Sequence, residues 1–293
     1  MLDHQDKRLD KAAIRAGFAR AAARYDEIGV LHHTVADELI ERLKLVKVEP
    51  MRVLDVGCGS GYVMGQLERL FRHARVTGVD VSAEMTRAAA NKRRWMSKQR
   101  FVVGDAECLP IDTDSVDVLV SDSTLQWCHT KVALDEFWRV LKPGGVLTFS
   151  TYGPDTLQEL RTSWSQADST PHVHEFLDMH DLGDALMHAK FTDPVVDVDR
   201  ITVTYRSLED LLRDIKCLGS RNANIDRRRT LTGRDRFGRF KAAYQAQRNA
   251  DNLLPVTYEV VYGHAWVPDA GNVGINKKGV ATVALEQITT KRL

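Results

Sequence analysis

Five short runs of β-branched residues alternate with helical patterns between residues 52 and 152, and this alternation constrains the fold more than any other feature. The runs are RVLDVG, ARVTGVD, FVVGD, VDVLVSD and GGVLTFST. Strands that alternate with helices favour a parallel sheet with helices on both faces. The segment LKPGG, residues 141–145, is typical of a helix end followed by a turn. The chain is therefore expected to have an α/β fold.

Helical patterns also flank this region. Two amphipathic helices are predicted between Ala12 and Leu45. After Tyr152 the pattern predicts helices at about 155–167 and 179–190, a strand at 200–205 and further helices from 208 to about 250. The alternating segment VTYEVVYGHAW, residues 256–266, predicts a last strand that is antiparallel.

A glycine-rich turn, VLDVGCGSGY, follows the first predicted strand. Gly57 and Gly59 match the first two glycines of the dinucleotide fingerprint G-x-G-x-x-G, but Tyr62 stands where the third is required. The P-loop signature G-K-[S/T] is absent from the chain. The turn therefore predicts a nucleotide site of a different kind from these two.

Acidic residues stand at the ends of the first three predicted strands. Asp55, Asp80 and Asp105 follow one another at intervals of 25 residues, one strand and helix apart, which brings all three to the carboxyl edge of the sheet. Asp55 would repel a pyrophosphate and attract an ammonium or sulfonium group. Asp80 is placed to accept hydrogen bonds from ribose hydroxyls, and Asp105 from an adenine amino group. Together they predict S-adenosylmethionine, although an aspartate after a strand is also a common helix N-cap.

The segments VLDVGCGSGY, GVDVS, VVGDAECLP and LKPGG resemble motifs of the class I S-adenosylmethionine-dependent methyltransferases, over residues 52–151. This resemblance implies a Rossmann-like fold with a seven-stranded, mostly parallel sheet whose last strand is antiparallel. It also implies S-adenosylmethionine as the cofactor. The residues expected to bind it are Asp55, Gly57, Gly59, Gly61, Asp80, Val81, Met85, Asp105, Ala106 and Asp122.

The flanks resemble a narrower family. FARAAARYDEIGVLHH, STLQWC, STYGPDTLQELRTSW and VTYEVVYGHAW are similar to segments of the malonyl-acyl carrier protein O-methyltransferases of biotin synthesis, over residues 14–267. Members methylate the free carboxylate of a malonyl thioester, so that fatty-acid elongation enzymes accept it as an ordinary primer. The resemblance implies malonyl-acyl carrier protein, or malonyl-CoA, as the substrate. We expect a helical lid at 1–46, a cofactor-binding core at 47–152, the rest of the fold with a helical carrier-docking insertion at 153–267, and a tail at 268–293.

Methyl transfer to a carboxylate needs no general base, because a carboxylic acid with a pKa of about 4 is already ionised at neutral pH. The remaining work is to align the reacting atoms and exclude water. The predicted positioning residues are Tyr25, Gln126 and Trp127, and the predicted substrate contacts are His172, Tyr152, Arg161 and Arg221. Packing in the core is the competing interpretation for an aromatic residue such as Tyr152. His172 and His174 have no third ligand nearby, so no metal site is expected.

An arginine-rich segment spans residues 221–241. It contains eight basic residues against Asp226 and Asp235, a local charge of +6 (eight minus two) in a chain with 41 basic and 40 acidic residues. Guanidinium groups pair with carboxylates and phosphates, so the segment is a candidate docking surface for an acidic carrier protein. A solvated helix face is the alternative. The predicted docking residues are Arg227, Arg228, Arg229, Arg234 and Arg236.

The bulk composition excludes several other classes. The balanced charge argues against a nucleic-acid partner. The four cysteines are scattered without a CxxC pair, which argues against a zinc site and a disulfide framework. The first residues, MLDHQDKRLDK, are charged where a secretory signal is apolar, and no apolar run approaches membrane-spanning length. A soluble, cytoplasmic protein without a membrane partner is expected.

Two other enzyme classes and one non-enzymatic role remain open from the sequence. Quinone-ring C-methyltransferases and aconitate carboxyl methyltransferases share the same core. The arginine hydroxylase of respiratory complex I assembly resembles the segments STYGPDTLQELR and HVHEFLDMHDLG and performs no methyl transfer. A cofactor-binding scaffold without chemistry is the third possibility.

Overall fold

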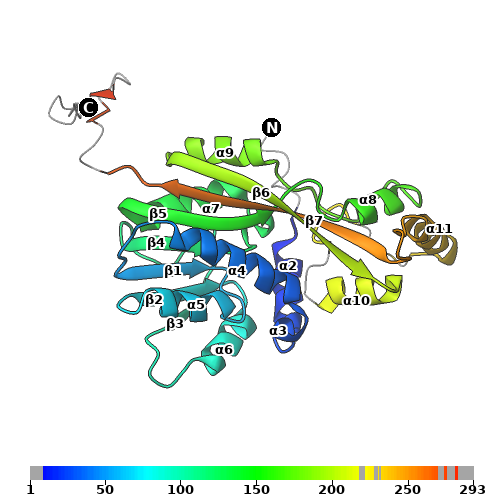
Figure 1. The fold of residues 1–293 in the computed structure, drawn as a ribbon, viewed down its shortest axis with the longest axis horizontal. Helices are drawn as coiled ribbons and strands as arrows, with labels where there is room; N and C mark the ends of the chain where they lie inside the picture. The colour runs from blue at the N-terminus through cyan, green and yellow to red at the C-terminus, as the bar shows by residue number, and fades with distance from the viewer. Residues whose placement is uncertain are drawn as a thin grey trace.

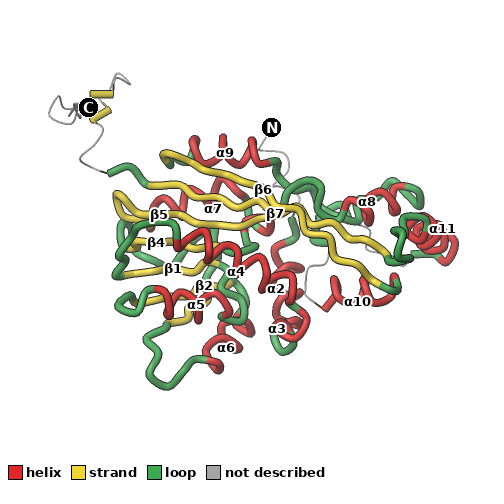
Figure 2. The backbone as a smooth tube through the Cα atoms, in the orientation of Figure 1, coloured by secondary structure: helices red, strands yellow, loops and turns green. Residues whose placement is uncertain are grey.

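A seven-stranded sheet forms the centre of the molecule (Figures 1 and 2). The computed structural model describes residues 9–217, 222–227, 230, 232–269, 274–275 and 281–282. The strands are β1 (Arg52–Val56), β2 (Arg75–Asp80), β3 (Arg100–Val103), β4 (Val116–Ser121), β5 (Leu141–Tyr152), β6 (Thr192–Tyr205) and β7 (Leu254–Trp266). Their order is β3-β2-β1-β4-β5-β7-β6, and β7 is antiparallel to both of its neighbours. The predicted mostly parallel sheet with an antiparallel last strand is confirmed.

Helices pack on both faces of this sheet because its strands bury side chains on both sides. In β4, Val118 and Val120 join one apolar core and Leu119 joins the other. The first core includes α4 and α5, and the second includes α7 and α9. The helices are α2 (Lys11–Ala21), α3 (Tyr25–Ile28), α4 (Val30–Lys44), α5 (Tyr62–Leu70), α6 (Ala83–Lys92), η2 (Leu125–Trp127), α7 (Thr130–Val140), α8 (Gln158–Ser165), α9 (Met179–His188), α10 (Leu208–Cys217) and α11 (Arg234–Gln245).

Three element predictions differ from the structure. The N-terminal region forms three described helices instead of two, because α3 is separated from α2 by a turn and from α4 by Gly29. The helix α7 ends at LKPGG as predicted, with Leu141 as its C-cap, but these residues already begin β5, where the pairing with β4 is irregular, instead of preceding the strand. Finally, β6 begins at Thr192 instead of 200. It is an edge strand that contains Pro194, and its inside-outside alternation changes phase between Val198 and Asp199, so residues 192–199 do not continue the pattern of 200–205.

The carboxyl edge of the parallel strands is where the remaining elements gather. The ends of β6 and β7 extend past the sheet and carry α10 and α11 between them, with α8 alongside (Figure 1). The N-terminal helices α2 and α3 lie at the same edge, and α3 contacts α10. In the tail, β8 (Gly274–Ile275) pairs with β9 (Ala281–Thr282) apart from the main sheet. Among the described residues, no helix is long and apolar enough to cross a membrane.

Candidate active site

The turn after β1 has the backbone shape that only glycine adopts without strain. Gly57, Gly59 and Gly61 have φ angles of +77°, +49° and +86°. The backbone N–H groups of Gly57 and Cys58 both donate to the Val79 carbonyl, at 2.7 and 3.0 Å. A Cβ on Gly57 would lie 1.8 Å from Thr124 Oγ1. The turn is therefore pressed against the segment that follows β4, and a cavity opens beside it.

This main cavity lies at the carboxyl edge of the sheet and has a volume of about 1020 Å³, its open mouth included. The turns after β1 to β4 form its floor and the N-terminal helices cover it. Most of the predicted cofactor residues line it. They are Asp55, Gly57, Gly59, Asp80, Val81, Met85, Asp105, Ala106 and Asp122. The exception is Gly61, which does not line this cavity and forms the left-handed N-cap of α5.

Three carboxylates face this cavity, of which Asp55 and Asp80 are buried and Asp122 is partly buried. Both oxygens of Asp55 lack a hydrogen-bond partner among the described residues, and only 1% of the residue is exposed. Asp80 accepts hydrogen bonds from the backbone of Gly59 at 2.9 Å, and from that of Ser82 at 2.8 Å. Asp122 accepts one from Ser150 Oγ at 2.6 Å. Burial raises the pKa of Asp80 and of Asp122 to about 6, and the pKa of Asp55 well above its ordinary value.

The donor set of this cavity fits S-adenosylmethionine. Burying a carboxylate without a partner is costly, so Asp55 is suited to a ligand that brings positive charge or hydrogen-bond donors. A carboxylate has about four acceptor positions, so Asp80 keeps free positions for the hydroxyls of a ribose. Asp105, two residues past β3, accepts from the backbone of Glu107 at 3.0 Å and lines the same cavity. These are the acids that a cationic nucleoside requires.

Three sets of contacts hold the N-terminal helices over the cavity. Lys11 of α2 donates to the Glu107 carboxylate and, at 3.0 Å, to the carbonyl of Trp127. Asp26 of α3 accepts from Ser60 in the glycine turn and forms an ion pair with Lys92 of α6. Asp10, the N-cap of α2, pairs with Arg227 at 2.8 Å. These contacts place Tyr25 beside Gly59, within 4.0 Å of the position that a Cβ on this glycine would take.

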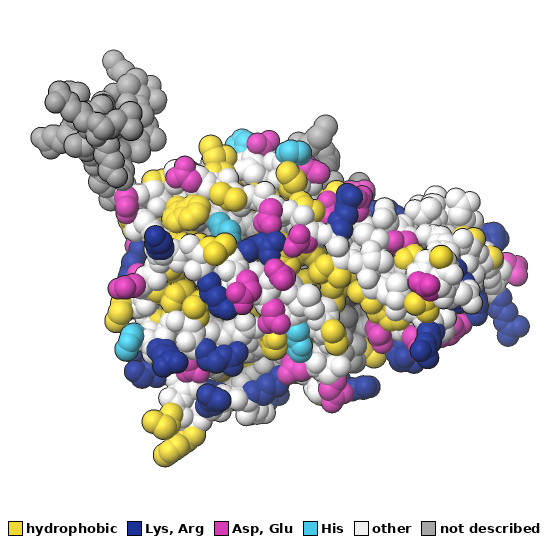
Figure 3. Space-filling model, viewed as in Figure 1, with side chains coloured by type: hydrophobic (Ala, Val, Ile, Leu, Met, Phe, Trp, Pro, Cys, Tyr) yellow, Lys and Arg dark blue, Asp and Glu magenta, His cyan; other side chains and the backbone are white. Residues whose placement is uncertain are grey.

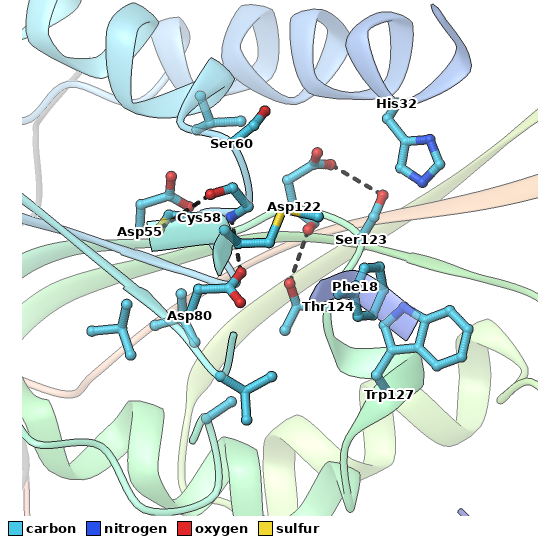
Figure 4. A pocket seen from close by; sticks show the side chains of 18 of the residues that line it. Phe18, His32, Asp55, Cys58, Ser60, Asp80, Asp122, Ser123, Thr124 and Trp127 are labelled. Carbon is cyan, nitrogen blue, oxygen red and sulfur yellow. Dashed lines mark hydrogen bonds between the residues drawn. The ribbon is translucent and has the colours of Figure 1, made fainter. Parts of the chain in front are cut away.

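Two side cavities, of about 530 and 420 Å³, adjoin the main cavity. They share Tyr152, His174 and Phe176 with each other, and the smaller one shares His32 and Trp127 with the main cavity. In Figure 4, Asp55 and Asp80 lie on one side of the main cavity, His32, Phe18 and Trp127 lie on the other, and Asp122 lies between them. The Trp127 ring contacts Phe18, with centroids 5.5 Å apart, and His174, at 5.0 Å. Trp127 therefore forms a wall between the main cavity and the smaller side cavity.

The predicted substrate residues do not all lie here. Tyr25 lines the main cavity, and Trp127 lines the main cavity and the smaller side cavity. Tyr152 lines both side cavities, and Gln126 lines the larger one. The amide of Gln126 is already engaged, because it donates to the Ser123 carbonyl at 2.6 Å and accepts from Thr151 at 3.1 Å.

His172 and Arg161 line none of these three cavities. His172 stacks on Trp164, with centroids 3.7 Å apart, and bonds Asp168 at 2.9 Å. Arg161 donates to the carbonyls of Pro154 and Thr156, at 2.9 and 3.1 Å. Arg221 lies outside the described residues.

The predicted docking arginines are also divided. Arg227 is paired with Asp10, and Arg236 of α11 lies 3.2 Å from Asp168. Arg234, at the start of α11, is exposed and makes no ion pair with a described residue. Arg228 and Arg229 lie outside the described residues.

Sequence reasoning missed several lining residues, of which Phe18, His32, Thr124 and His174 are the most informative. Phe18 and His32 lie in the segment FARAAARYDEIGVLHH, whose resemblance to a family does not by itself indicate a role for these side chains. His174 is one of two histidines in PHVHEF, and no local pattern distinguishes it from His172. Within the described part of the chain, no group of three or more His, Cys, Asp or Glu side chains has the arrangement of a metal site.

Comparisons with known proteins agree on one family. The family described as "Methyltransferase domain" matches residues 54–149. The malonyl-[acyl-carrier protein] O-methyltransferase of Laribacter hongkongensis is 45% identical over 270 residues, which cover 89% of this chain and 91% of the relative. The enzyme of the same name from Halorhodospira halophila is 41% identical and covers 93% and 96%.

Solved structures support the same fold at low sequence identity. The YcgJ protein of Bacillus subtilis matches with a TM-score of 0.58 and 18% identity over 80% of this chain and 99% of its own. A putative methyltransferase of Bacillus halodurans matches with a TM-score of 0.56 and 17% identity, over the same shares of the two chains. The chain, with its acidic cavity at the carboxyl edge of a seven-stranded sheet, belongs to the family of malonyl-[acyl-carrier protein] O-methyltransferases.

Proposed function

We propose that this protein transfers a methyl group from S-adenosylmethionine to the free carboxylate of a malonyl group carried by acyl carrier protein. The observation that carries this proposal is the contact of two unlike cavities at Trp127. The main cavity is lined by buried carboxylates and suits a cation. No described residue that lines the side cavities is Asp, Lys or Arg, and their one glutamate, Glu175, is exposed. The side cavities therefore suit an acyl group with a small anionic end.

The cofactor, when bound, supplies a methyl group activated by a positively charged sulfur. The buried Asp55 and the partly buried Asp122 offer negative charge that stabilises such a cation. Asp80 and Asp105 offer the acceptors for the nucleoside part. The glycine turn lets the backbone approach the ligand without side chains in the way.

The chain's contribution to the reaction is alignment and exclusion of water. Tyr25 and Phe18 come from the N-terminal helices, and together with Trp127 they form an aromatic wall on the main cavity. The carboxylate oxygen of the substrate forms the new bond to the methyl carbon while the carbon–sulfur bond breaks. Because an anion and a cation give two neutral products, no proton moves and no general base is needed. Enclosure by aromatic side chains favours this charge neutralisation, because it removes water that would stabilise the separate ions.

The carrier protein is proposed to dock at the end of the molecule formed by α10 and α11. Figure 3 shows dark blue side chains of Lys and Arg exposed at this end, mixed with acidic ones. Arg234 is exposed there without an intramolecular ion pair to a described residue, and guanidinium groups suit an acidic partner. The proposed division of labour follows: residues 1–46 are the lid, 47–152 bind the cofactor, 153–267 receive the acyl carrier, and 268–293 are a tail. A role in biotin synthesis in the cytoplasm is part of the same proposal.

The direct test is transfer of radiolabel from the methyl donor. The full chain is incubated with malonyl-acyl carrier protein, and acetyl-acyl carrier protein serves as the control that has no free carboxylate. We expect label on the malonyl protein only, in a base-labile ester. Label on a demethylquinone or on aconitate, with none on the malonyl thioester, would identify one of the other methyltransferase classes. Hydroxylated arginine in a protein substrate without label transfer would identify the hydroxylase. Restoring growth of a strain that requires biotin tests the cellular role.

A further inference from the structure

Three buried polar atoms that line the side cavities lack a hydrogen-bond partner among the described residues: the Tyr152 hydroxyl, Nε2 of His174 and Nδ1 of His32. His32 also lines the main cavity, whereas Tyr152 and His174 line only the side cavities. Tyr152 and His174 are each only 7% exposed. Tyr152 stands at the end of β5, and His174 lies in the irregular segment between α8 and α9. Both side chains line the two side cavities. A buried polar group without a partner costs about 1–3 kcal/mol, so such groups point to a ligand that completes them.

The surroundings of Tyr152 and His174 define the ligand's chemistry. Leu157, Ile215 and Tyr258 give the smaller side cavity an apolar wall, and Phe176 lines both side cavities. The larger one also has polar side chains, among them the exposed Glu175, and none of the described lining residues is Lys or Arg. His174 contacts Trp127 at 5.0 Å and Phe176 at 4.5 Å between ring centroids, so its ring is held by packing. The pocket therefore offers neutral hydrogen-bond donors in an apolar wall, next to the cavity that suits a cation.

We propose that the Tyr152 hydroxyl and the His174 Nε2–H donate hydrogen bonds to the malonyl carboxylate and hold it against the main cavity, an inference that rests on the proposed function. One oxygen of the malonyl carboxylate accepts hydrogen bonds from Tyr152 and His174. A lone pair of the other oxygen points toward the methyl group of the cofactor. The new oxygen–carbon bond forms as the carbon–sulfur bond breaks, and the electron pair of that bond remains on sulfur. No proton is transferred, so both residues position the substrate and do not act as acid or base.

Neutral donors suit this task better than an arginine. A carboxylate paired with a guanidinium is stabilised as an anion in the ground state, and that pairing would oppose its attack on the methyl group. Burial, aided by the charge of Arg161, lowers the pKa of His174 to about 4, so the ring is neutral at physiological pH. Arg161 therefore lowers the pKa of His174 through its charge, although Arg161 lines neither side cavity.

The same two groups explain how the site would select a free carboxylate. An acetyl thioester would leave both donors unpaired in a buried site. Sites of this kind strongly reject ligands that lack the expected polar partner. The methyl ester product offers weaker acceptors than the carboxylate, so the proposed contacts weaken as the reaction completes.

Three variants test the inference: Tyr152→Phe, His174→Gln and His174→Leu. Glutamine places an amide N–H near the position of Nε2, so His174→Gln should keep more activity than His174→Leu. We expect kcat/KM for malonyl-acyl carrier protein to fall about 10- to 100-fold in Tyr152→Phe and in His174→Leu. The affinity for the methyl donor, measured by calorimetry, should stay within about twofold of the parent protein. His172→Gln is the matched control from the same segment and should keep most of the activity, because His172 lines neither side cavity.

Stability supplies a second readout that a structural role would not produce. Because the Tyr152 hydroxyl is buried without a partner, Tyr152→Phe should unfold at the same temperature as the parent protein or higher while losing activity. If the parent protein methylates malonyl-acyl carrier protein and both Tyr152→Phe and His174→Leu keep their kcat/KM within about twofold, the inference is wrong and the proposed function stands. An equal loss in His172→Gln would also overturn the inference. If the parent protein itself does not methylate the malonyl substrate, the proposed function fails first.

Discussion

The guanidinium of Arg227 lies 2.8 Å from the carboxylate of Asp10, a residue 217 positions earlier in the sequence. Asp10 is the N-cap of α2, and its neighbour Leu9 pairs through its backbone with Asn224. Arg227 also donates to the Asn224 carbonyl at 2.9 Å. Arg227 therefore connects the first described helix to the segment between α10 and α11. Its guanidinium already has partners within the molecule.

Asp10→Ala and Arg227→Ala should therefore be coupled. The two side chains are each 21% exposed, so a double-mutant cycle on unfolding free energy should give a coupling of about 1 kcal/mol. Each single variant also loses one bond of its own, so each should cost more than the coupling alone. Asp10→Ala loses the cap bond to the Ala13 amide, 3.0 Å long, and Arg227→Ala loses the bond to the Asn224 carbonyl. The control cycle is the exposed pair Lys241 and Glu209, for which we expect no measurable coupling. Independent effects at Asp10 and Arg227 would mean that the contact does not hold α2 in solution.

Gly57→Ala should destabilise the protein by more than about 2 kcal/mol. The substitution combines a positive φ with a Cβ only 1.8 Å from Thr124 Oγ1, so either the turn or the segment after β4 must move. Gly65→Ala is the matched control because its Cβ meets nothing within 4 Å in α5, and it should stabilise the protein by about 0.5–1 kcal/mol. Thermal unfolding of the ligand-free variants measures both. A Gly57→Ala variant as stable as the parent would show that the turn is not held against Thr124.

Asp80→Ala should weaken binding of S-adenosylmethionine and of S-adenosylhomocysteine by a similar factor, about 10- to 100-fold. The reason is the loss of charge-assisted hydrogen bonds to the part that both molecules share. Calorimetry with the exposed control Asp112→Ala measures the effect. A loss confined to the methylated, positively charged form would show that Asp80 responds to the sulfonium charge instead of the ribose.

Acid should weaken binding of the methyl donor. Burial raises the pKa of Asp80 and of Asp122 to about 6, so both carboxylates are charged above this pH and protonated below it. A cationic ligand favours the charged forms, so affinity should be highest above pH 6 and fall below it by up to about tenfold per pH unit for each carboxylate that must lose its proton.

The ligand-free protein should show the opposite trend, because its folded state holds these protons more tightly than the unfolded chain. Its stability should decrease as pH rises from about 4 to 6. Asp122→Asn should reduce both the pH dependence of affinity and the pH dependence of stability, as measured by calorimetry and chemical unfolding between about pH 4 and about 8. An affinity that does not change with pH would mean that neither carboxylate is coupled to the ligand.

The periodic parts of the fold could be predicted because their signals are local. The alternation of strands and helices predicted β1 to β5 and the antiparallel β7, and the spacing of Asp55, Asp80 and Asp105 predicted that these acids share one edge. The edge strand β6 was predicted too short, because its alternation changes phase between Val198 and Asp199 and Pro194 lies in its first half.

Local patterns in the sequence were sufficient to predict the sheet, the glycine turn and the acids that surround the main cavity, because strand period and turn chemistry act over a few residues. Packing between distant segments places His174, and not His172, in a side cavity, and it turns Arg227 toward Asp10. Both histidines lie in a segment without regular structure, so the side of the chain that each one faces depends on packing. The His174 ring contacts Trp127 and the His172 ring stacks on Trp164, and the two tryptophans come from different elements. Contacts between residues far apart in the chain have no local pattern, so the fold alone determines them.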